Sequence, residues 1–502
     1  MQTDSWTRRR FLQVLAASGA AGILPAGARA SSKDPIRISI LHTTDLHGHI
    51  LPTVSYEGEK NLGGFARCAT QIRTWRLENP HSLLIDVGDV FQGTEIGLRT
   101  QGQVMLRAFE LLGYDGWVIG NHEFDWGPEP LERLITTSPV PALCANARLE
   151  GAAFERVKPW ILREVAGIRI GILGLTTPGL PYWLQPELTK GFEATDPAPA
   201  AAAAVAELRD AGADAIVIAA HMGTRSEGDN FANRIEAIAR AVPDAAVILA
   251  GHTHRDIPSS RVRGVLYTQA NYHGLNVGKT DLFFDPDSKR LLAAEASTVR
   301  MGDSVTPDPV VLSSSARDLE DSRLALAAKA GSIKETLSAR SQGTVPSDVQ
   351  RLIGTSIFQC LASRGVRVDG VLHGSFARED IAPGDLRVGD CWKIIPYENF
   401  VLLADFSPSE MALVLGDAAK SGGASTLALL GCRPDDPNKR YRIAMNSYDA
   451  ASAGQRLPKL REIVRSKHAR SEFLRLQTRE LLIEFLAKHT PGGVGRSDLI
   501  SA

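Results

Sequence analysis

Apolar runs alternate with amphipathic segments along the chain from about residue 35 to residue 303. Strand-like apolar runs lie at residues 38–41, 82–85, 117–119, 215–220 and 245–250, and several of them are apolar throughout. Such runs are typical of strands that are covered on both faces. The segments with helical spacing lie at residues 63–77, 103–112 and 200–208. This alternation predicts a layered α/β fold with its sheet inside, and strand-like residues 262–267 and 282–284 close the pattern.

The composition changes after this region. Residues 316–340 are rich in Ala, Leu, Lys and Glu at helical spacing, which predicts a long linking helix that ends at residues 341–343. This segment could instead belong to the outer layer of one domain. The remaining residues predict a second, smaller α/β or α+β domain, with helices at 349–364, 408–420 and 472–488 and strands at 370–372 and 400–406.

The first thirty residues have the features of a secretory leader. Arg8, Arg9 and Arg10 precede Phe11, residues 14–28 are uncharged, and a small-residue cleavage signal ends at Ala30. The paired arginines resemble a twin-arginine signal. We expect the twin-arginine export machinery as a partner and a periplasmic or extracellular location. Stable membrane insertion after cleavage is not expected, because the apolar segment is shorter than the ~20 residues that span a bilayer.

Charge and cysteine content exclude some classes of protein. The 56 Lys and Arg residues nearly balance the 57 Asp and Glu residues, so no field favours a nucleic acid polymer or an anionic membrane. The 5 cysteines are widely spread and form no Cys-x-x-Cys pair. An odd number at irregular spacing indicates neither a disulfide framework nor a zinc knuckle.

Each of the apolar runs leads into a polar cluster that contains metal-ligand residue types. In open α/β folds, ligands bind outside the carboxyl ends of the strands. One cluster alone could be an ordinary turn, but their repetition at successive strand ends indicates a shared site. The candidate ligands are Asp45, His47, Asp89, Asn121, His221, His252 and His254.

This set is large enough for two divalent ions side by side, which need mixed nitrogen and oxygen donors. Asp45, His47 and His254 can hold one ion. Asn121, His221 and His252 can hold the other, with Asp89 between them. The sequence does not distinguish Mn, Zn, Mg, Co or Fe, because the same donors accept several ions.

The order of the clusters resembles a known family. Asp-x-His-Gly, Gly-Asp, Gly-Asn-His-Glu-Phe-Asp, His-x-Gly and Gly-His-Thr-His follow one another between about residues 36 and 284. This series resembles the calcineurin-like metallophosphoesterases, and in particular the secreted bacterial 5'-nucleotidase/UDP-sugar hydrolase group. The resemblance implies the same metal ligands, and His122 and Asp125 match the catalytic pair of that group.

The resemblance also implies a fold and a domain arrangement. The expected fold is α/β, with a four-layer α/β/β/α metallophosphoesterase domain followed by a smaller α/β (α+β) domain similar to the 5'-nucleotidase C-terminal domain. We place a signal peptide at 1–30, the dinuclear catalytic domain at 31–310, the linker helix at 311–343 and the substrate-specificity domain at 344–502.

The implied activity is hydrolysis of nucleoside 5'-monophosphates, or of UDP-sugars, to a nucleoside and phosphate. Two cations neutralise the phosphate oxygens and lower the pKa of bound water toward ~7, which supplies the attacking hydroxide. His122, kept protonated and oriented by Asp125, is then suited to stabilise the phosphoryl group and the leaving oxygen.

In the resembled group, the C-terminal domain binds phosphate through an arginine and stacks the base between two rings. The matching positions are Arg378 for the phosphate and Tyr397 and Tyr448 for the rings, with Asn399 and Arg340 as further contacts. The group's Gly-Gly-Asp-Gly loop is replaced by residues 452–456 without its aspartate. Recognition of the base and ribose is therefore open.

Other functions are compatible with the same residues. A thiosulfohydrolase would use a similar fold, but Phe124 and Asp125 favour phosphate esters. Cyclic-nucleotide phosphodiesterase activity on the same metals is a further alternative, as is a nucleotide-binding relative without turnover. Among the remaining histidines, His42 is expected in the core and His49 in a solvated loop, while His273 could line the cleft.

Overall fold

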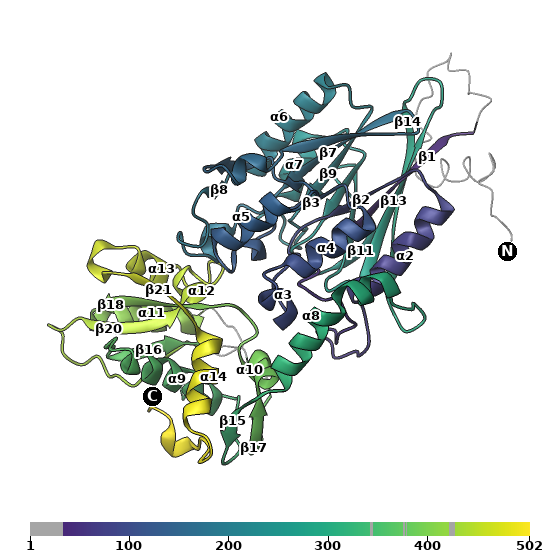
Figure 1. Cartoon of the computed structure of the whole chain (residues 1–502). Coiled ribbons are helices and arrows are strands. Elements are labelled where there is room, and N and C mark those ends of the chain that lie inside the picture. Colours follow the sequence, from purple (N-terminus) through teal and green to yellow (C-terminus); the bar gives the residue numbers. More distant parts are fainter. Residues whose placement is uncertain (1–33, 342–344, 375–376, 378, 421–426, 502) are drawn as a thin grey trace.

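The computed structural model describes residues 34–341, 345–374, 377, 379–420 and 427–501. The expected signal peptide and Arg378 lie outside these residues. Figure 1 shows two bodies, a larger one built from the first part of the chain and a smaller one built from the last part. Among the described helices, none has both the length and the apolar character needed to cross a membrane.

The larger body contains two six-stranded sheets. The first sheet has the order β14 (Leu291–Arg300), β13 (Asn276–Phe284), β1 (Ile36–Thr43), β2 (Ser82–Asp86), β3 (Gly116–Val118) and β4 (Ala142–Leu143). The second has the order β11 (Asp256–Val262), β12 (Val265–Ala270), β10 (Val247–Ala250), β9 (Ala215–Ala220), β7 (Ile168–Leu175) and β6 (Trp160–Val165).

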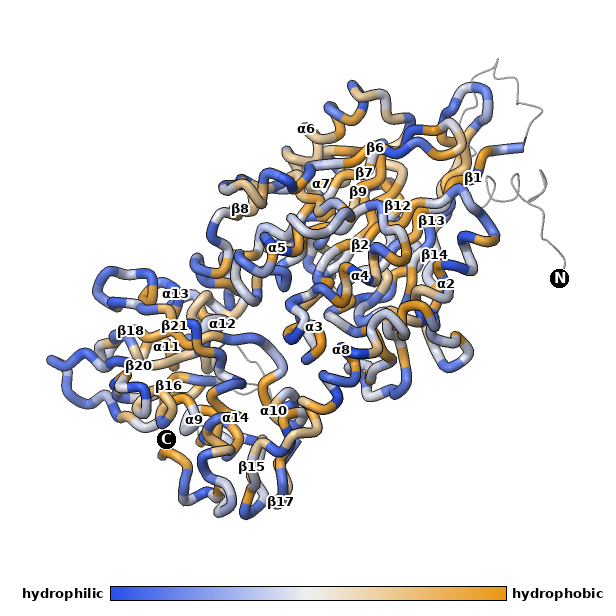
Figure 2. Tube along the Cα trace, viewed as in Figure 1, coloured by the Kyte–Doolittle hydropathy of each residue, from blue (hydrophilic) through white to orange (hydrophobic). Residues whose placement is uncertain are grey.

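Successive side chains of a strand point to opposite faces of the sheet, and this alternation decides which layer each residue packs in. Ile38 and Ile40 of β1 pack between the two sheets, whereas Leu41 packs under the helices on the outer face. The outer helices of the first sheet are α2 (Phe65–Glu78), α3 (Glu95–Arg99), α4 (Gln103–Leu112) and α8 (Pro309–Ala327). The second sheet is covered by α6 (Pro197–Asp210) and α7 (Ile235–Ala241). Figure 2 shows the apolar residues concentrated along the inner strands. The predicted α/β/β/α arrangement is confirmed.

Several parts of this domain were not predicted. The antiparallel pair β6 and β7 was missed, as was the edge strand β14. The single strand expected at residues 262–267 is instead a hairpin, because Arg263 and Gly264 adopt positive φ values of 51° and 91° between the paired residues Val262 and Val265. Two such residues form the tight turn that joins antiparallel strands.

The linking helix is shorter than predicted. Helix α8 begins at Pro309, where Asp308 caps it by accepting the backbone N–H groups of Val310 and Val311. It ends at Ala327, and β15 (Lys329–Ile333) then pairs with β17 (Gly384–Arg387). The prediction of helix as far as residue 340 is wrong because strand pairing and burial override the helical composition here. Helix α8 contacts α2, α3 and α4 of the larger body and α10 (Val388–Ile394) of the smaller one.

The smaller body contains a five-stranded sheet with helices on both faces. Its order is β19 (Ala428–Leu430), β16 (Gly370–His373), β20 (Tyr441–Asn446), β18 (Phe400–Phe406) and β21 (Glu472–Gln477). Helices α9 (Asp348–Ser363) and α14 (Thr478–Lys488) pack on one face, and α11 (Pro408–Lys420) and α13 (Pro458–Val464) on the other. The helix predicted at 472–488 begins only at Thr478, because residues 472–477 pair with β18 as an edge strand.

Candidate metal centre and the adjoining cavity

The predicted ligands follow strands of both sheets. Asp45 follows β1, Asp89 follows β2 and Asn121 follows β3, while His221 follows β9 and His252 and His254 follow β10. Since β1, β2 and β3 are parallel neighbours and β9 and β10 are parallel neighbours, each set of loops leaves its sheet at one edge. The side chains from the two edges meet.

The first group contains Asp45, His47 and His254. One possible ligand atom of each lies within 4.8 Å of those of the other two. The Nε2 atom of His254 lies 3.3 Å from Oδ1 of Asp45 and 3.1 Å from Nε2 of His47.

The second group contains Asp89, His221 and His252, with the same spread of 4.8 Å. Nε2 of His221 lies 3.0 Å from Oδ2 of Asp89 and 3.2 Å from Oδ1 of Asn121. Oδ2 of Asp89 also lies 4.0 Å from Nε2 of His47. Asp89 therefore faces both groups.

Hydrogen bonds to backbone oxygens orient two of the imidazoles. Nδ1 of His47 lies 2.9 Å from the carbonyl oxygen of Gln92, and Nδ1 of His221 lies 2.8 Å from that of Val87. A carbonyl oxygen only accepts, so both Nδ1 atoms carry the proton and both Nε2 atoms direct a lone pair into the centre. Two imidazole lone pairs and two buried carboxylates converge there, and this donor set fits divalent cations.

The backbone at the centre is strained. Asp45, His47, Asp89, His252 and His254 have φ values of 50°, 47°, 56°, 68° and 52°. Non-glycine residues rarely adopt this left-handed region, and each such residue costs about 1–3 kcal/mol. Strain of this kind clusters at functional sites, because surrounding structure must hold the side chains in place.

Glu123 supports the centre and was not singled out from the sequence. Its buried carboxylate accepts the backbone N–H groups of Asp89, Val90 and Gly120. It thereby joins the loops that follow β2 and β3. Burial, with a contribution from Asp89, raises the pKa of Glu123 to about 7. The motif places Glu123 three residues after Gly120, but nothing in the sequence shows that the β2 loop reaches it.

His122 lies beside the second group. Its backbone N–H donates to Oδ1 of Asp89 at 2.8 Å, and its Nδ1 donates to Oδ2 of Asp125 at 2.8 Å. Burial disfavours the charged imidazole, but the carboxylates of Asp125 and Asp89 outweigh it and raise the pKa of His122 well above its usual value. The side chain can therefore present a proton at Nε2.

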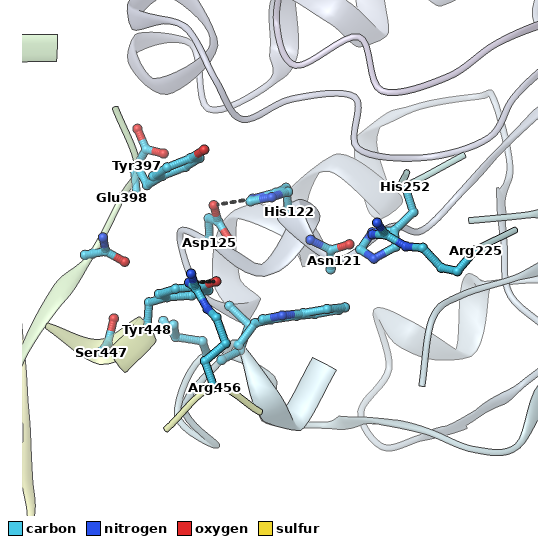
Figure 3. A pocket seen from close by; sticks show the side chains of 14 residues that line it. Asn121, His122, Asp125, Arg225, His252, Tyr397, Glu398, Ser447, Tyr448 and Arg456 are labelled. Atoms are coloured by element: carbon cyan, nitrogen blue, oxygen red, sulfur yellow. Dashed lines mark hydrogen bonds and ion pairs between the residues drawn. The ribbon is translucent and has the colours of Figure 1, made fainter. Parts of the chain in front are cut away.

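A cavity of about 380 Å³ adjoins the centre and lies between the two bodies (Figure 3). Its lining residues come from both, and they are Asn121, His122, Asp125, Trp183, Leu184, Leu188, Arg225, His252, Tyr397, Glu398, Asn399, Ser447, Tyr448 and Arg456. Tyr397, Asn399 and Tyr448, which the sequence placed at the substrate, all line this cavity. Arg340 does not, and its exposed side chain lies on the segment after β15.

Several cavity residues were missed. Trp183 and Arg225 come from the larger body, and Glu398 and Arg456 from the smaller one. Glu398 is paired with the buried Arg479 and accepts a hydrogen bond from the side chain of Gln92 across the boundary between the bodies. Residues of this kind carry no sequence signal, because their role depends on how the bodies meet.

The remaining histidines divide into two kinds. His42 is fully buried on β1, as expected, beside Gly278, where a Cβ atom would lie 1.9 Å from its ring. His49 lies on the loop after β1, as expected, but it is only partly exposed, because its ring stacks on His273 with 3.7 Å between the centroids. His273 in turn lies 5.5 Å from the ring of His47, so both rings pack against the metal centre.

Comparisons with known proteins agree with this architecture. Residues 38–256 match the family model described as calcineurin-like phosphoesterase. The silent protein UshA(0) of Salmonella typhimurium is 26% identical and covers 92% of this chain and 93% of its own length.

Two solved structures show the same overall fold. A putative 5'-nucleotidase from Staphylococcus aureus, solved with alpha-ketoglutarate, has a TM-score of 0.74 and 19% identity, and covers 90% of this chain and 97% of its own. The sulfate thiohydrolase SoxB of Thermus thermophilus has a TM-score of 0.61 and 18% identity, with coverage of 94% and 96%. With the motifs, the two sheets and the two His/Asp groups in place, residues 38–256 match the calcineurin-like phosphoesterase family, and the chain is similar to UshA and the 5'-nucleotidases over about 90% of its length.

Proposed function

We propose that this metallophosphoesterase hydrolyses nucleoside 5'-monophosphates to a nucleoside and phosphate. The observation that carries the proposal is the placement of His122, with its partner Asp125, between two His/Asp groups and a cavity lined by Tyr397 and Tyr448. Names of similar proteins, among them the 5'-nucleotidase of Staphylococcus aureus, support the same substrate class.

The proposed ligands are Asp45, His47 and His254 for one ion and Asn121, His221 and His252 for the other, with Asp89 shared. When bound, two divalent ions would neutralise phosphate charge and activate water for attack on phosphorus. The chain's own part is to position the ester and to handle the leaving oxygen. His122, charged because of Asp125 and Asp89, stabilises negative charge on that oxygen and can donate a proton to it.

The two tyrosines would hold the organic part of the ester. An aromatic contact contributes about 1–3 kcal/mol per stacked base. Asn399 lines the same part of the cavity and offers an amide that can both donate and accept hydrogen bonds. The uracil base of a UDP-sugar would lie between the same two tyrosine rings.

Export is part of the proposal. The twin-arginine leader at residues 1–30 would deliver the enzyme to the periplasm or the cell exterior. Replacing Arg8 and Arg9 together by Lys should keep the protein in the cytoplasm, as measured by cell fractionation. Equal export of the variant would contradict this part.

Metal-stripped protein, reconstituted separately with Mn, Zn, Mg, Co and Fe, tests the proposed activity. AMP, UDP-glucose, a cyclic nucleotide, p-nitrophenyl phosphate and a thiosulfate-conjugated peptide would each be offered. AMP hydrolysis should exceed the others and should require metal.

His122→Asn is the matched variant for this experiment. Loss of a general acid typically costs about 10²–10⁴-fold in turnover, whereas metal content should be unchanged. A variant that lost its metals would make His122 a ligand instead. Preferred cleavage of the thiosulfate conjugate, or no turnover of any compound, would overturn the proposed function.

A further inference from the structure

Two arginines line the cavity, Arg225 from the larger body and Arg456 from the smaller one. Figure 3 shows Arg225 beside His252 and Arg456 beside Tyr448. Among the described residues, neither arginine forms a salt bridge with a carboxylate. Both side chains are exposed to solvent and are therefore accessible to a ligand.

The two acidic side chains among the described lining residues, Asp125 and Glu398, are each already paired with a cation. Asp125 is paired with His122 at 2.8 Å. Glu398 is paired with the buried guanidinium of Arg479, which also lies over the ring of Trp392 with 3.4 Å to the centroid. Among the described residues that line the cavity, Arg225 and Arg456 are therefore the cations without a carboxylate partner.

Arg456 is held in position by two contacts. Its Nε donates to the carbonyl oxygen of Ala453 at 2.9 Å, and its Nη2 donates to the hydroxyl oxygen of Tyr448 at 3.1 Å. The guanidinium carbon lies 5.9 Å from the centroid of the Tyr448 ring. Asp449 is near, but its buried carboxylate accepts a hydrogen bond from Asn446. One edge of the guanidinium is thus fixed at the ring that would stack on the ligand.

The loop that carries Arg456 is strained. Ser452, Ala453, Gly454 and Gln455 have consecutive φ values of 113°, 48°, 69° and 67°. Three of the four are not glycine, and each costs about 1–3 kcal/mol in this region. The backbone oxygen of Tyr182, in the larger body, accepts the N–H of Gly454 at 3.0 Å and fixes the loop against the boundary. A loop held in this conformation by contacts from both bodies is suited to place one side chain accurately.

The two arginines suit two different anions. Arg225 is beside His252, one of the proposed metal ligands, and so fits the phosphate that is cleaved. Arg456 is beside Tyr448, where the leaving group would lie. A guanidinium binds a carboxylate or a phosphate strongly because two parallel N–H groups can donate to two oxygens.

From this arrangement we infer that the preferred ester carries a second anionic group, a carboxylate or a phosphate, on its leaving group, and that Arg456 selects it. The inference rests on the proposed phosphomonoesterase function. Arg456 is a specificity-determining residue in this account, since it contacts the part of the substrate that is not transformed.

Matched pairs of esters test the inference on the metal-loaded full chain. Phenyl phosphate and 4-carboxyphenyl phosphate differ by a carboxylate, and AMP and adenosine 3',5'-bisphosphate differ by a phosphate. The quantity measured is the ratio of kcat/KM for the anionic ester to that for its neutral partner, compared between wild type and Arg456→Gln. Intrinsic reactivity cancels in this comparison.

The wild type should prefer the anionic member of at least one pair, and which pair it is distinguishes a carboxylate from a phosphate. Arg456→Gln should lower that preference by about 10- to 100-fold, the usual size of a hydrogen bond to a charged group. Turnover of the neutral ester should fall by a smaller factor, because it loses only the support that Arg456 gives to the Tyr448 hydroxyl. Arg465→Gln, which removes an exposed arginine of the same region outside the cavity, should leave the preference unchanged.

An equal loss on both members of a pair would overturn the inference, because Arg456 would then contact the cleaved phosphate or merely support Tyr448. No preference in the wild type would overturn it as well. If no phosphomonoester is hydrolysed, the proposed function fails, and titration calorimetry with 4-hydroxybenzoate against phenol still measures the anion site. Tighter binding of 4-hydroxybenzoate that is lost in Arg456→Gln would then support the site alone, and equal binding would overturn it.

Discussion

The carboxylate of Glu123 accepts the backbone N–H of Asp89 at 3.0 Å, and this bond connects the loops that follow β2 and β3. The same carboxylate accepts the N–H groups of Val90 at 2.7 Å and Gly120 at 2.6 Å. Gly120 lies so close that a Cβ atom there would be 2.3 Å from Oδ1 of Asp89. Two proposed ligands, Asp89 and Asn121, therefore depend on one buried acid that is not itself among the candidate ligands.

Glu123→Ala should destabilise the protein markedly. Each buried N–H group left without a partner costs about 1–3 kcal/mol, so the free energy of unfolding should fall by at least ~3 kcal/mol. Urea unfolding of the metal-free protein measures this loss, and elemental analysis should show reduced metal content. Glu123→Gln retains an acceptor oxygen and should lose less. If Glu123→Ala lowers the free energy of unfolding by less than ~1 kcal/mol, water replaces the carboxylate as the acceptor.

The buried pair of Glu398 and Arg479 makes a second prediction. Removing one partner of a buried ion pair typically costs about 3–5 kcal/mol, because the other charge stays buried. Glu398→Ala should lower the free energy of unfolding by that amount and should also remove the contact with Gln92 across the boundary.

The exposed pair of Arg475 and Glu129 provides the control, since it also crosses the boundary. Its atoms are 3.3 Å apart and its side chains are 53% and 58% exposed. Exposed pairs contribute about 0–1 kcal/mol, so Arg475→Ala should have little effect in the same urea experiment. Similar losses for Glu398→Ala and Arg475→Ala would contradict the importance of burial.

The sequence predicted the parts of the site that follow directly from strand ends. Asp45, Asp89 and His221 each come after an apolar run, and parallel strands bring such ends to one edge. The same reasoning gave the layers, because apolar runs that are buried on both faces need covering on both sides. What these patterns record is local burial.

The sequence did not predict features that depend on distant contacts. Residues 329–333 have the composition of the helix before them, and only pairing with β17 makes them a strand. Arg456 was noticed as a departure from the family's loop, but its place in the cavity follows from the bond between Gly454 and Tyr182 of the other body. Such contacts join residues about 270 positions apart, and no local pattern records them.

Tyr56 should affect the metal affinity of the group that contains His254. Its hydroxyl lies 3.3 Å from Nδ1 of His254, and its ring stacks on Tyr272 with 4.2 Å between the centroids. Contacts of this kind orient a ligand, and their loss typically costs about 10–100-fold in metal affinity. Because Tyr56 is 56% exposed, Tyr56→Phe should lie near the lower limit, at about tenfold.

A chelator competition assay measures this affinity. In Tyr56→Phe, one of the two ions should bind more weakly and the other should bind with unchanged affinity. Tyr182→Phe is the control, since Tyr182 packs on Phe231 and under Arg461 instead. Unchanged affinity in Tyr56→Phe would mean that solvent orients His254 equally well.

Asp308 gives a prediction about pH. It caps α8 through the N–H groups of Val310 and Val311, and it accepts a hydrogen bond from Nε of Arg73 at 2.7 Å. Burial opposes its charge, but these donors outweigh burial and lower the pKa of Asp308 below its ordinary value. A depressed carboxyl pKa stabilises the fold above the unfolded pKa of ~4, and this contribution disappears as pH falls through the folded pKa.

Asp308→Asn keeps an acceptor for the cap but removes the charge. At pH 7 the wild type should exceed the variant by about 0.5–1 kcal/mol in the free energy of unfolding, a modest value because Arg73 is half exposed. At pH 3 and below the difference should shrink, since the wild-type carboxyl becomes neutral as well. Urea unfolding at both pH values measures the two differences. A difference that persists undiminished at low pH would show that Asp308 acts through its shape and not through its charge.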